Sequence, residues 1–233
     1  MSAVQGESTS PLTLFPHATV VLPPQFCASA EYYAVMAAYG SAIIHDGMPY
    51  DKRFKSTHRA EIADTRGRLT LTVPVSKPHG RCTWAQTTVS PHDEWWTIHF
   101  TALESAYGRT PWFEYYADDF RPLFSAGQVG RSLTDFDADF DSLVRRLLSI
   151  PTQVRHCADH DFQPQPGALD LRRADFDTMV TIAPYWQVRA DSLGFTGGLS
   201  VLDLLFNLGP EAPLVLRRAV SGVSARETPG ERL

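Results

Sequence analysis

The sequence predicts a mixed α/β fold (α/β or α+β), with a small mixed sheet that begins in an N-terminal strand–helix–strand unit and packed helices in the second half. One indication is a pair of short apolar runs, 18–23 and 41–46, on either side of a helix-like segment. This spacing is typical of a βαβ unit with parallel strands. The other is a set of apolar stripes at helical spacing after residue 90, which predicts packed helices.

The first strand is expected at 18–23 because the run is rich in β-branched residues and stops at Pro23. Ser29 is the expected N-cap of the following helix, and Gly40 is the expected stop. The second strand follows at 41–46.

A β-hairpin is expected over 58–75, where two apolar runs flank the turn residues Asp64 and Gly67. Apolar and polar residues alternate through "LTLTVPV", which indicates one buried face. The segment 84–90 is a further candidate strand.

Three helices are expected next. The first has Ser90 as its N-cap, Pro91 at its first helical position and Gly108 as its stop. The others cover 111–124 and 134–150, each with a stripe of buried aromatic or aliphatic residues.

The polar, proline-broken segment 156–173 is harder to interpret, and its "ALDLR" stretch is either a strand or a loop. A last clear helix begins at Ser200, with Asp203 completing a capping box, and ends at Gly209. We expect one domain over 16–220 between flexible segments at 1–15 and 221–233.

The composition narrows the function classes. A net charge of −5 argues against nucleic-acid binding. The three cysteines are scattered, which fits a reducing compartment and offers no metal framework. With no apolar run of membrane-spanning length and no secretory signal at the start, a cytoplasmic protein without a membrane span is expected. Oligomeric state is not predicted.

The common catalytic motifs GxGxxG, GxxxxGK[ST], GxSxG and HExxH are absent. His156 and His160 would share a metal on a helix, but a polar loop is the preferred interpretation, so no metal and no cofactor are expected. Cys27 sits between a strand and a helix, as nucleophiles often do, although a buried packing role is the simpler alternative.

The segment after the second strand is the first candidate site, because open parallel sheets bind ligands beyond their strand ends. Lys52, Arg53 and Arg59 suit an anionic group such as a phosphate, with Tyr50 beside them. His58 is a candidate for moving a proton. A solvated, charged loop is the open alternative.

A second candidate is the aromatic bend "SAYGRTPWFEYY", where Tyr107, Trp112 and Phe113 form either a core corner or the wall of a sugar pocket. His99 lies one turn after Trp95, off the main apolar stripe, and is either catalytic or half buried with local partners.

Five segments in register resemble the WbqC-like protein family from about residue 18 to 216: "VVLPPQF", "YDKR…HRAEI", "LTLTVPVSK", "HFTALESAYGRTPWFEYY" and "PYWQVRADSLGFTGGLSVLDLLFNLGP". The family's Tyr-x-Lys and polar-Arg pairs correspond to Tyr50 with Lys52 and to His58 with Arg59. The family usually has Asn at the position of His58, and the spacing leaves either Lys52 or Arg53 as the basic match.

The resemblance implies a bacterial enzyme of surface-polysaccharide (O-antigen-like) biosynthesis that transfers an acyl or aminoacyl (glycine) group to a phosphate-bearing sugar. In that role His58 or His99 would accept the proton, the cations would hold phosphate and the aromatic bend would face the sugar. The alternative is a non-catalytic anion- or sugar-binding or scaffold protein of the same pathway.

Overall fold

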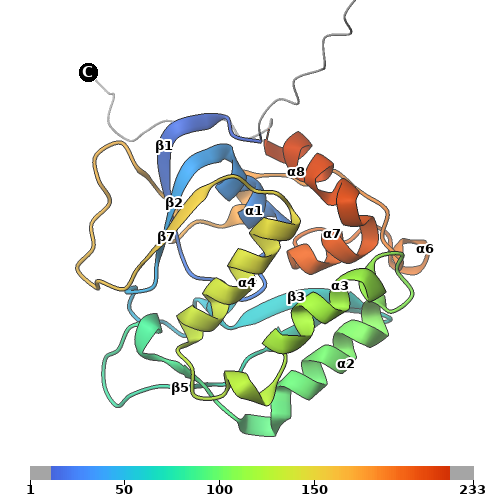
Figure 1. Ribbon diagram of the computed structural model, residues 1–233, viewed down its shortest axis with the longest axis horizontal. Helices are drawn as coiled ribbons and strands as arrows, with labels where there is room; N and C mark the ends of the chain where they lie inside the picture. The colour runs from blue at the N-terminus through green and yellow to red at the C-terminus, as the bar shows by residue number, and fades with distance from the viewer. Residues whose placement is uncertain (1–11, 221–233) are drawn as a thin grey trace, which may run out of the picture.

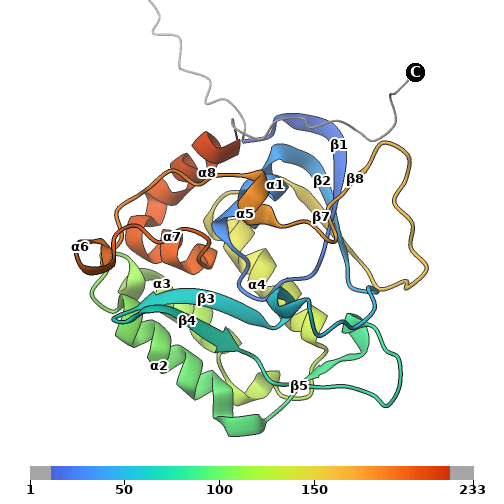
Figure 2. The same ribbon diagram turned by 180° about the vertical axis from the view of Figure 1, so that it is seen from behind.

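The fold is built around a four-stranded parallel sheet with the strand order β7–β2–β1–β8 (Figure 1, with β8 labelled in Figure 2). Its strands are β1 (Phe15–Leu22), β2 (Tyr39–His45), β7 (Gln153–Cys157) and β8 (Leu169–Asp170). The computed structural model describes residues 12–220. The predicted mixed α/β class and the parallel strand–helix–strand unit are confirmed.

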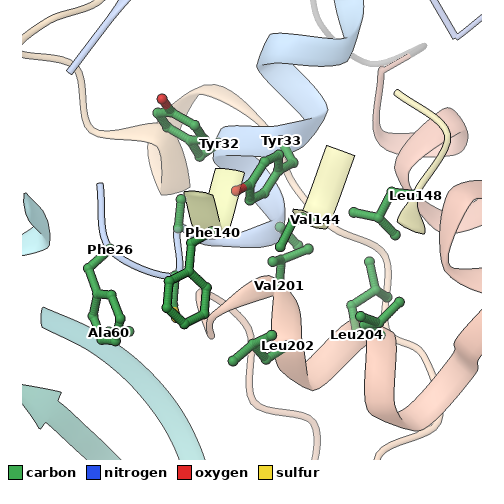
Figure 3. Packing of buried hydrophobic residues seen from close by; sticks show 14 of the residues in the cluster. Phe26, Tyr32, Tyr33, Ala60, Phe140, Val144, Leu148, Val201, Leu202 and Leu204 are labelled. Carbon is green, nitrogen blue, oxygen red and sulfur yellow. The ribbon is translucent and has the colours of Figure 1, made fainter. Parts of the chain in front are cut away.

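Helix α1 (Ala30–Ala38) connects β1 to β2 and lies buried on one face of the sheet. Ser29 caps it as predicted, because its side chain accepts a hydrogen bond from the backbone N–H of Tyr32 at 3.3 Å. Figure 3 shows Tyr33 of α1 close to Val144 and Val201, which belong to helices farther along the chain. The core therefore lies between the sheet and these helices.

The prediction that Gly40 stops α1 is wrong. The helix ends at Ala38, and Tyr39 already has extended backbone angles. Gly40 lies inside β2, where an added Cβ would fall 1.9 Å from the carbonyl oxygen of Pro16. The glycine is needed because the first two strands approach closely here.

The hairpin is confirmed as β3 (Arg59–Asp64) paired antiparallel with β4 (Gly67–Thr72), and it runs alongside helix α2 (Figure 2). The candidate strand at 84–90 is mostly wrong. Only β6 (Thr88–Val89) is extended, pairing with β5 (Val75–Ser76), and a 3₁₀ turn precedes it at Trp84–Gln86.

The predicted start of the next helix at Ser90 is also wrong. Helix α2 (Trp95–Tyr107) begins later, because Asp93 and Glu94 have φ angles of 57° and 44°, which no helix can accommodate. Its predicted end beside Gly108 is confirmed. The other predicted helices are present as α3 (Phe113–Phe120), α4 (Leu133–Leu147) and α7 (Val201–Leu208).

Ser200 caps α7 by accepting the N–H of Leu202, but the predicted capping box does not form. Asp203 instead accepts hydrogen bonds from the side chains of Tyr185 and Gln187. The remaining α-helices of the described part are α5 (Phe176–Met179), α6 (Ala190–Leu193) and α8 (Ala212–Val220).

The predicted flexible segments lie outside the described residues except for 12–15, where Leu12 is buried and β1 begins at Phe15. Within the described part, the helices are all too short or too polar to cross a bilayer.

Candidate functional site

The carboxyl ends of the four parallel strands meet at one edge of the sheet, which is where open α/β sheets bind ligands. Two cavities lie there and share Ala174. The edge cavity, of about 480 Å³, is lined by Met48, Pro49, Phe162, two histidines (His45 and His160), two arginines (Arg172 and Arg173) and the carboxylate of Asp170. The turn cavity, of about 220 Å³, lies between the β1–α1 turn, β3 and the segment after β8.

A larger hollow of about 970 Å³ lies on the face of the sheet opposite α1, away from these strand ends. Two of its polar side chains, Thr19 and Ser41, bond each other at 2.6 Å across β1 and β2. Its lining also includes His17, Gln153, Arg155 and Gln165, but it does not reach the strand ends where open α/β sheets bind ligands.

Arg172 is the most firmly held cation of the edge cavity. It forms a two-point contact with Asp170, with Nε to Oδ1 at 2.9 Å and Nη2 to Oδ2 at 2.7 Å. These bonds lower the pKa of Asp170. Its Nη1 donates to Nδ1 of His45 at 2.9 Å. The guanidinium is therefore oriented before any ligand arrives.

His45 orients Arg172 rather than moving a proton itself. It is 2% exposed, and burial, with Arg172 as a further cause, lowers its pKa. Because Nδ1 accepts from Arg172, Nε2 must carry the proton, which it donates to the backbone oxygen of Asp159 at 2.8 Å. The ring of Phe162 stands 5.1 Å from the His45 ring.

The predicted basic loop, residues 45–59, lines both cavities, but most of its side chains that were predicted to bind an anion do not. It lines the edge cavity with His45, Met48 and Pro49, and the turn cavity with Arg59. Lys52 and Arg53 are exposed and line neither cavity.

Two further side chains of that loop have local partners. The guanidinium of Arg53, 85% exposed, folds back onto Asp51 at 2.7 Å. Tyr50 packs on Trp84, with ring centroids 4.5 Å apart, and lines neither cavity.

His58 and His99 are both buried, and neither lines the two cavities. Burial is the main cause that lowers the pKa of each to about 4, so both rings are neutral at pH 7. The Nδ1 atom of each has no hydrogen-bond partner among the described residues. His99 is surrounded by aromatic rings, with the Trp95 ring centroid 5.2 Å away.

The aromatic bend packs inside the molecule. Tyr107 is 0% exposed, and its hydroxyl accepts a hydrogen bond from the backbone N–H of Ala63 at 3.3 Å. Phe113 packs on Phe206, with ring centroids 5.1 Å apart. These residues form a corner between α2, α3 and α7, and neither lines the two cavities.

Trp112 belongs to the same corner. It is half buried and covers Gly209, where an added Cβ would fall 2.2 Å from the ring. It therefore packs against the end of α7 and is not brought beside the basic loop.

The helical interpretation of His156 and His160 is wrong. His156 lies in strand β7 and contacts Asp46, whereas His160 lies in the following loop beside Asp161.

Cys27 lines the turn cavity, is 2% exposed and has a φ of 41°. Burial, followed by the charge of Asp137, raises the pKa of its thiol. A protonated, buried thiol is a poor nucleophile.

Sequence reasoning missed Arg172, Arg173 and Phe162. The available signal was the "ALDLR" stretch: taken as a strand of the sheet, it places the two arginines directly beyond a strand end.

Comparison with known proteins agrees with the resemblance seen in the sequence. The model of the WbqC-like protein family matches residues 24–173, more than half of the chain and nearly all of the edge cavity. The chain is 25% identical over 218 residues to "Uncharacterized protein Rv1507c" of Mycobacterium tuberculosis (strain ATCC 25618 / H37Rv), covering 80% of this chain and 91% of that protein. No solved structure matches significantly. The chain belongs to the WbqC-like protein family.

Proposed function

We propose that this chain is an enzyme of surface-polysaccharide biosynthesis that binds a phosphate-bearing sugar in the edge cavity and transfers an acyl or aminoacyl group to it. The pathway and the type of transfer come from the family resemblance. The observation that carries the binding site is Arg172, held in place by Asp170 and His45 in a 480 Å³ cavity at the carboxyl edge of a parallel sheet.

The other lining residues fit the same ligand. Arg173 adds a second, exposed guanidinium, which lies 5.2 Å from the ring of Phe54. Two guanidinium groups suit a phosphate or diphosphate: Arg173 can donate to two oxygens, and Arg172 keeps one N–H on Nη2 beyond its bonds to Asp170, His45 and Phe162. Phe162 offers the apolar face that sugar rings and bases pack against. The volume lies within the range of small-molecule sites.

The transfer step needs a proton acceptor. A hydroxyl or amine of the sugar attacks the carbonyl carbon of an activated acyl donor, its proton passes to a base, and the donor's leaving group departs with the bonding electron pair. His160 is the better placed base, because it lines the edge cavity. His58 and His99, the proton acceptors expected from the sequence, are buried and line neither cavity, so they are poorly placed for this step.

Binding is tested by calorimetric titration with UDP-glucose and with inorganic pyrophosphate. Arg172→Gln and Arg173→Gln are each expected to weaken binding about tenfold or more, since each removes a charge-assisted contact. Arg53→Gln is the matched control, because it removes an exposed arginine that lies outside the cavity lining. Equal losses in all three variants, or no binding by the wild type, would refute the edge cavity as the site.

Turnover is tested by incubating the wild type and His160→Asn with a panel of nucleotide sugars and acyl or aminoacyl donors, followed by mass spectrometry of the sugar. The acylated product is expected from the wild type and should be strongly reduced with His160→Asn.

A non-catalytic sugar-phosphate-binding role is the second candidate. The burial of His58 and His99 favours it, because neither imidazole lines the cavity that would hold the sugar. Tight binding that depends on Arg172, with no product from any donor in the panel, would select this role over the enzymatic one.

A further inference from the structure

A second group of ionisable side chains lies on the face of the sheet that α1 covers, apart from the edge cavity. We call it the acid cluster: Asp46 follows β2, Asp137 and Asp141 lie one turn apart on α4, and His156 lies on β7. The three carboxylates are buried, with 6%, 2% and 5% of their residue surfaces exposed. Three buried carboxylates on two neighbouring elements repel one another unless something positive lies between them.

Protein partners satisfy only part of this cluster. Asp46 Oδ2 contacts His156 Nδ1 at 2.9 Å, and Asp141 Oδ2 accepts from Arg145 Nε at 2.7 Å. Asp141 is also hydrogen-bonded by the side chain of Tyr33. Among the described residues, no hydrogen-bond partner is found for Asp46 Oδ1 or for either carboxylate oxygen of Asp137. Buried polar atoms in proteins rarely lack a partner, and a bound ion can supply the one that the chain does not.

The unpartnered Asp137 faces a small hollow. It lines a space of about 10 Å³ together with Asp141, His156 and Tyr32. A space of this order holds one water molecule or one small cation. Carboxylate oxygens are the ligands that hard divalent cations prefer, and an imidazole is compatible with Mn²⁺.

The charges support the same conclusion. Arg145 forms an ion pair with Asp141, and His156 forms one with Asp46, so Asp137 is the carboxylate of the cluster that has no hydrogen-bonded partner among the described residues. A divalent cation would neutralise Asp137, and His156 could join as a ligand only after losing the proton that it shares with Asp46.

On these grounds we propose that the acid cluster binds one hard divalent cation, Mg²⁺ or Mn²⁺, with Asp137 as its central ligand. No metal is predicted here from the sequence, because the ligands come from three separate segments. The site is independent of the edge cavity, where the sugar phosphate is proposed to bind. Its hollow shares one lining residue, Gln25, with the turn cavity.

A rival position for a cation exists on the surface. Among the described residues, Asp159, His160 and Asp161 are the set whose ligand atoms lie within 4.8 Å of one another, and all three are exposed. The carboxylates of the acid cluster are farther apart and would rotate inward around a cation. The surface set provides the matched control.

The test is a titration of the full-length, EDTA-treated protein with MnCl₂, followed by calorimetry and by the melting temperature. The wild type is expected to bind one Mn²⁺ and to melt at a higher temperature with it. Asp137→Asn should abolish both effects, and the double variant D159N/D161N should keep both. Asp137→Asn removes an unpaired buried charge without changing shape, so it should fold without metal at least as well as the wild type.

A second measurement does not depend on any variant. Anomalous scattering from a crystal of the wild type grown with MnCl₂ should place the ion between Asp46, Asp137 and Asp141. The proposal is overturned if the ion lies at Asp159–Asp161, if D159N/D161N loses binding while Asp137→Asn keeps it, or if the wild type binds no Mn²⁺. In the last case Asp137 is a neutral buried acid.

Discussion

The variant Tyr107→Phe tests whether the aromatic bend is part of the core or forms the wall of a sugar pocket. The Tyr107 side chain is fully buried, its hydroxyl accepts the backbone N–H of Ala63 at 3.3 Å, and it also hydrogen-bonds Asp203. Phenylalanine keeps the ring and its packing but removes the hydroxyl. If the bend is core, the change should reduce stability and leave ligand binding unchanged.

The size of the effect follows from those two contacts. The Ala63 N–H lies inside the molecule, and losing its acceptor leaves a buried donor unsatisfied, which costs about 1–3 kcal/mol. Asp203 still accepts from Tyr185 at 2.5 Å and Gln187 at 2.8 Å, so it loses only one of several donors. A total of about 2 kcal/mol lowers the melting temperature of a domain of this size by roughly 4–8 °C.

The assay is urea unfolding followed by tryptophan fluorescence, with UDP-glucose binding measured on the same samples. The control is Tyr115→Phe, since Tyr115 is 70% exposed and water can replace any contact of its hydroxyl. That variant should stay within about 0.5 kcal/mol of the wild type. An unchanged stability of Tyr107→Phe, combined with weaker ligand binding, would show that the hydroxyl faces a ligand and would refute the core interpretation.

Three further predictions follow from single contacts. Gly40→Ala should destabilise by about 3 kcal/mol in urea unfolding, because its Cβ would meet a strand carbonyl at 1.9 Å. The pKa of His99 is about 4 when folded against 6.5 unfolded, so the unfolded chain takes up the proton first. His99 should therefore lower stability by at most about 3 kcal/mol between about pH 6.5 and 4. His58, whose pKa is also about 4, adds to the same slope, so His99→Gln should make the slope shallower without abolishing it. Native Cys27 should resist DTNB while half-buried Cys82 and Cys157 react, and early labelling of Cys27 would contradict its burial.

The elements that could be predicted are those whose burial follows a clear sequence pattern. Segment 18–23 is a short apolar run that ends at a proline, and α4 repeats its buried residues at helical spacing, so the type and place of both were predicted correctly. Strand β7 was missed because it lies at the edge of the sheet, where its "QVRHC" sequence has one small apolar side chain facing the core. Strand β8 has only two residues, too few to show a period.

The late start of α2 has a different cause. Ser90, Pro91 and Asp93 form a good start signal by sequence, but the left-handed angles at Asp93 and Glu94 come from how the chain joins β6 to the helix. Local capping preference was overridden by that connection.

The candidate site shows how strand order, rather than local sequence, determines the orientation of an arginine side chain. The same Asp-x-Arg arrangement occurs twice at this edge, as Asp51 with Arg53 and as Asp170 with Arg172, and in both cases the aspartate accepts the arginine's backbone N–H and its guanidinium. Nothing local distinguishes the two.

The difference lies in one distant contact. Arg172 reaches the His45 ring, 127 positions away in the sequence, and its side chain is 19% exposed, whereas the Arg53 side chain is 85% exposed. That contact exists because β1 lies between β2, which ends at His45, and β8, which leads to Arg172. The charged loop after β2 and the segment after β8 thus reach the same edge of the sheet, and strand order, which no local pattern shows, decides that Arg172 rather than Arg53 faces the cavity.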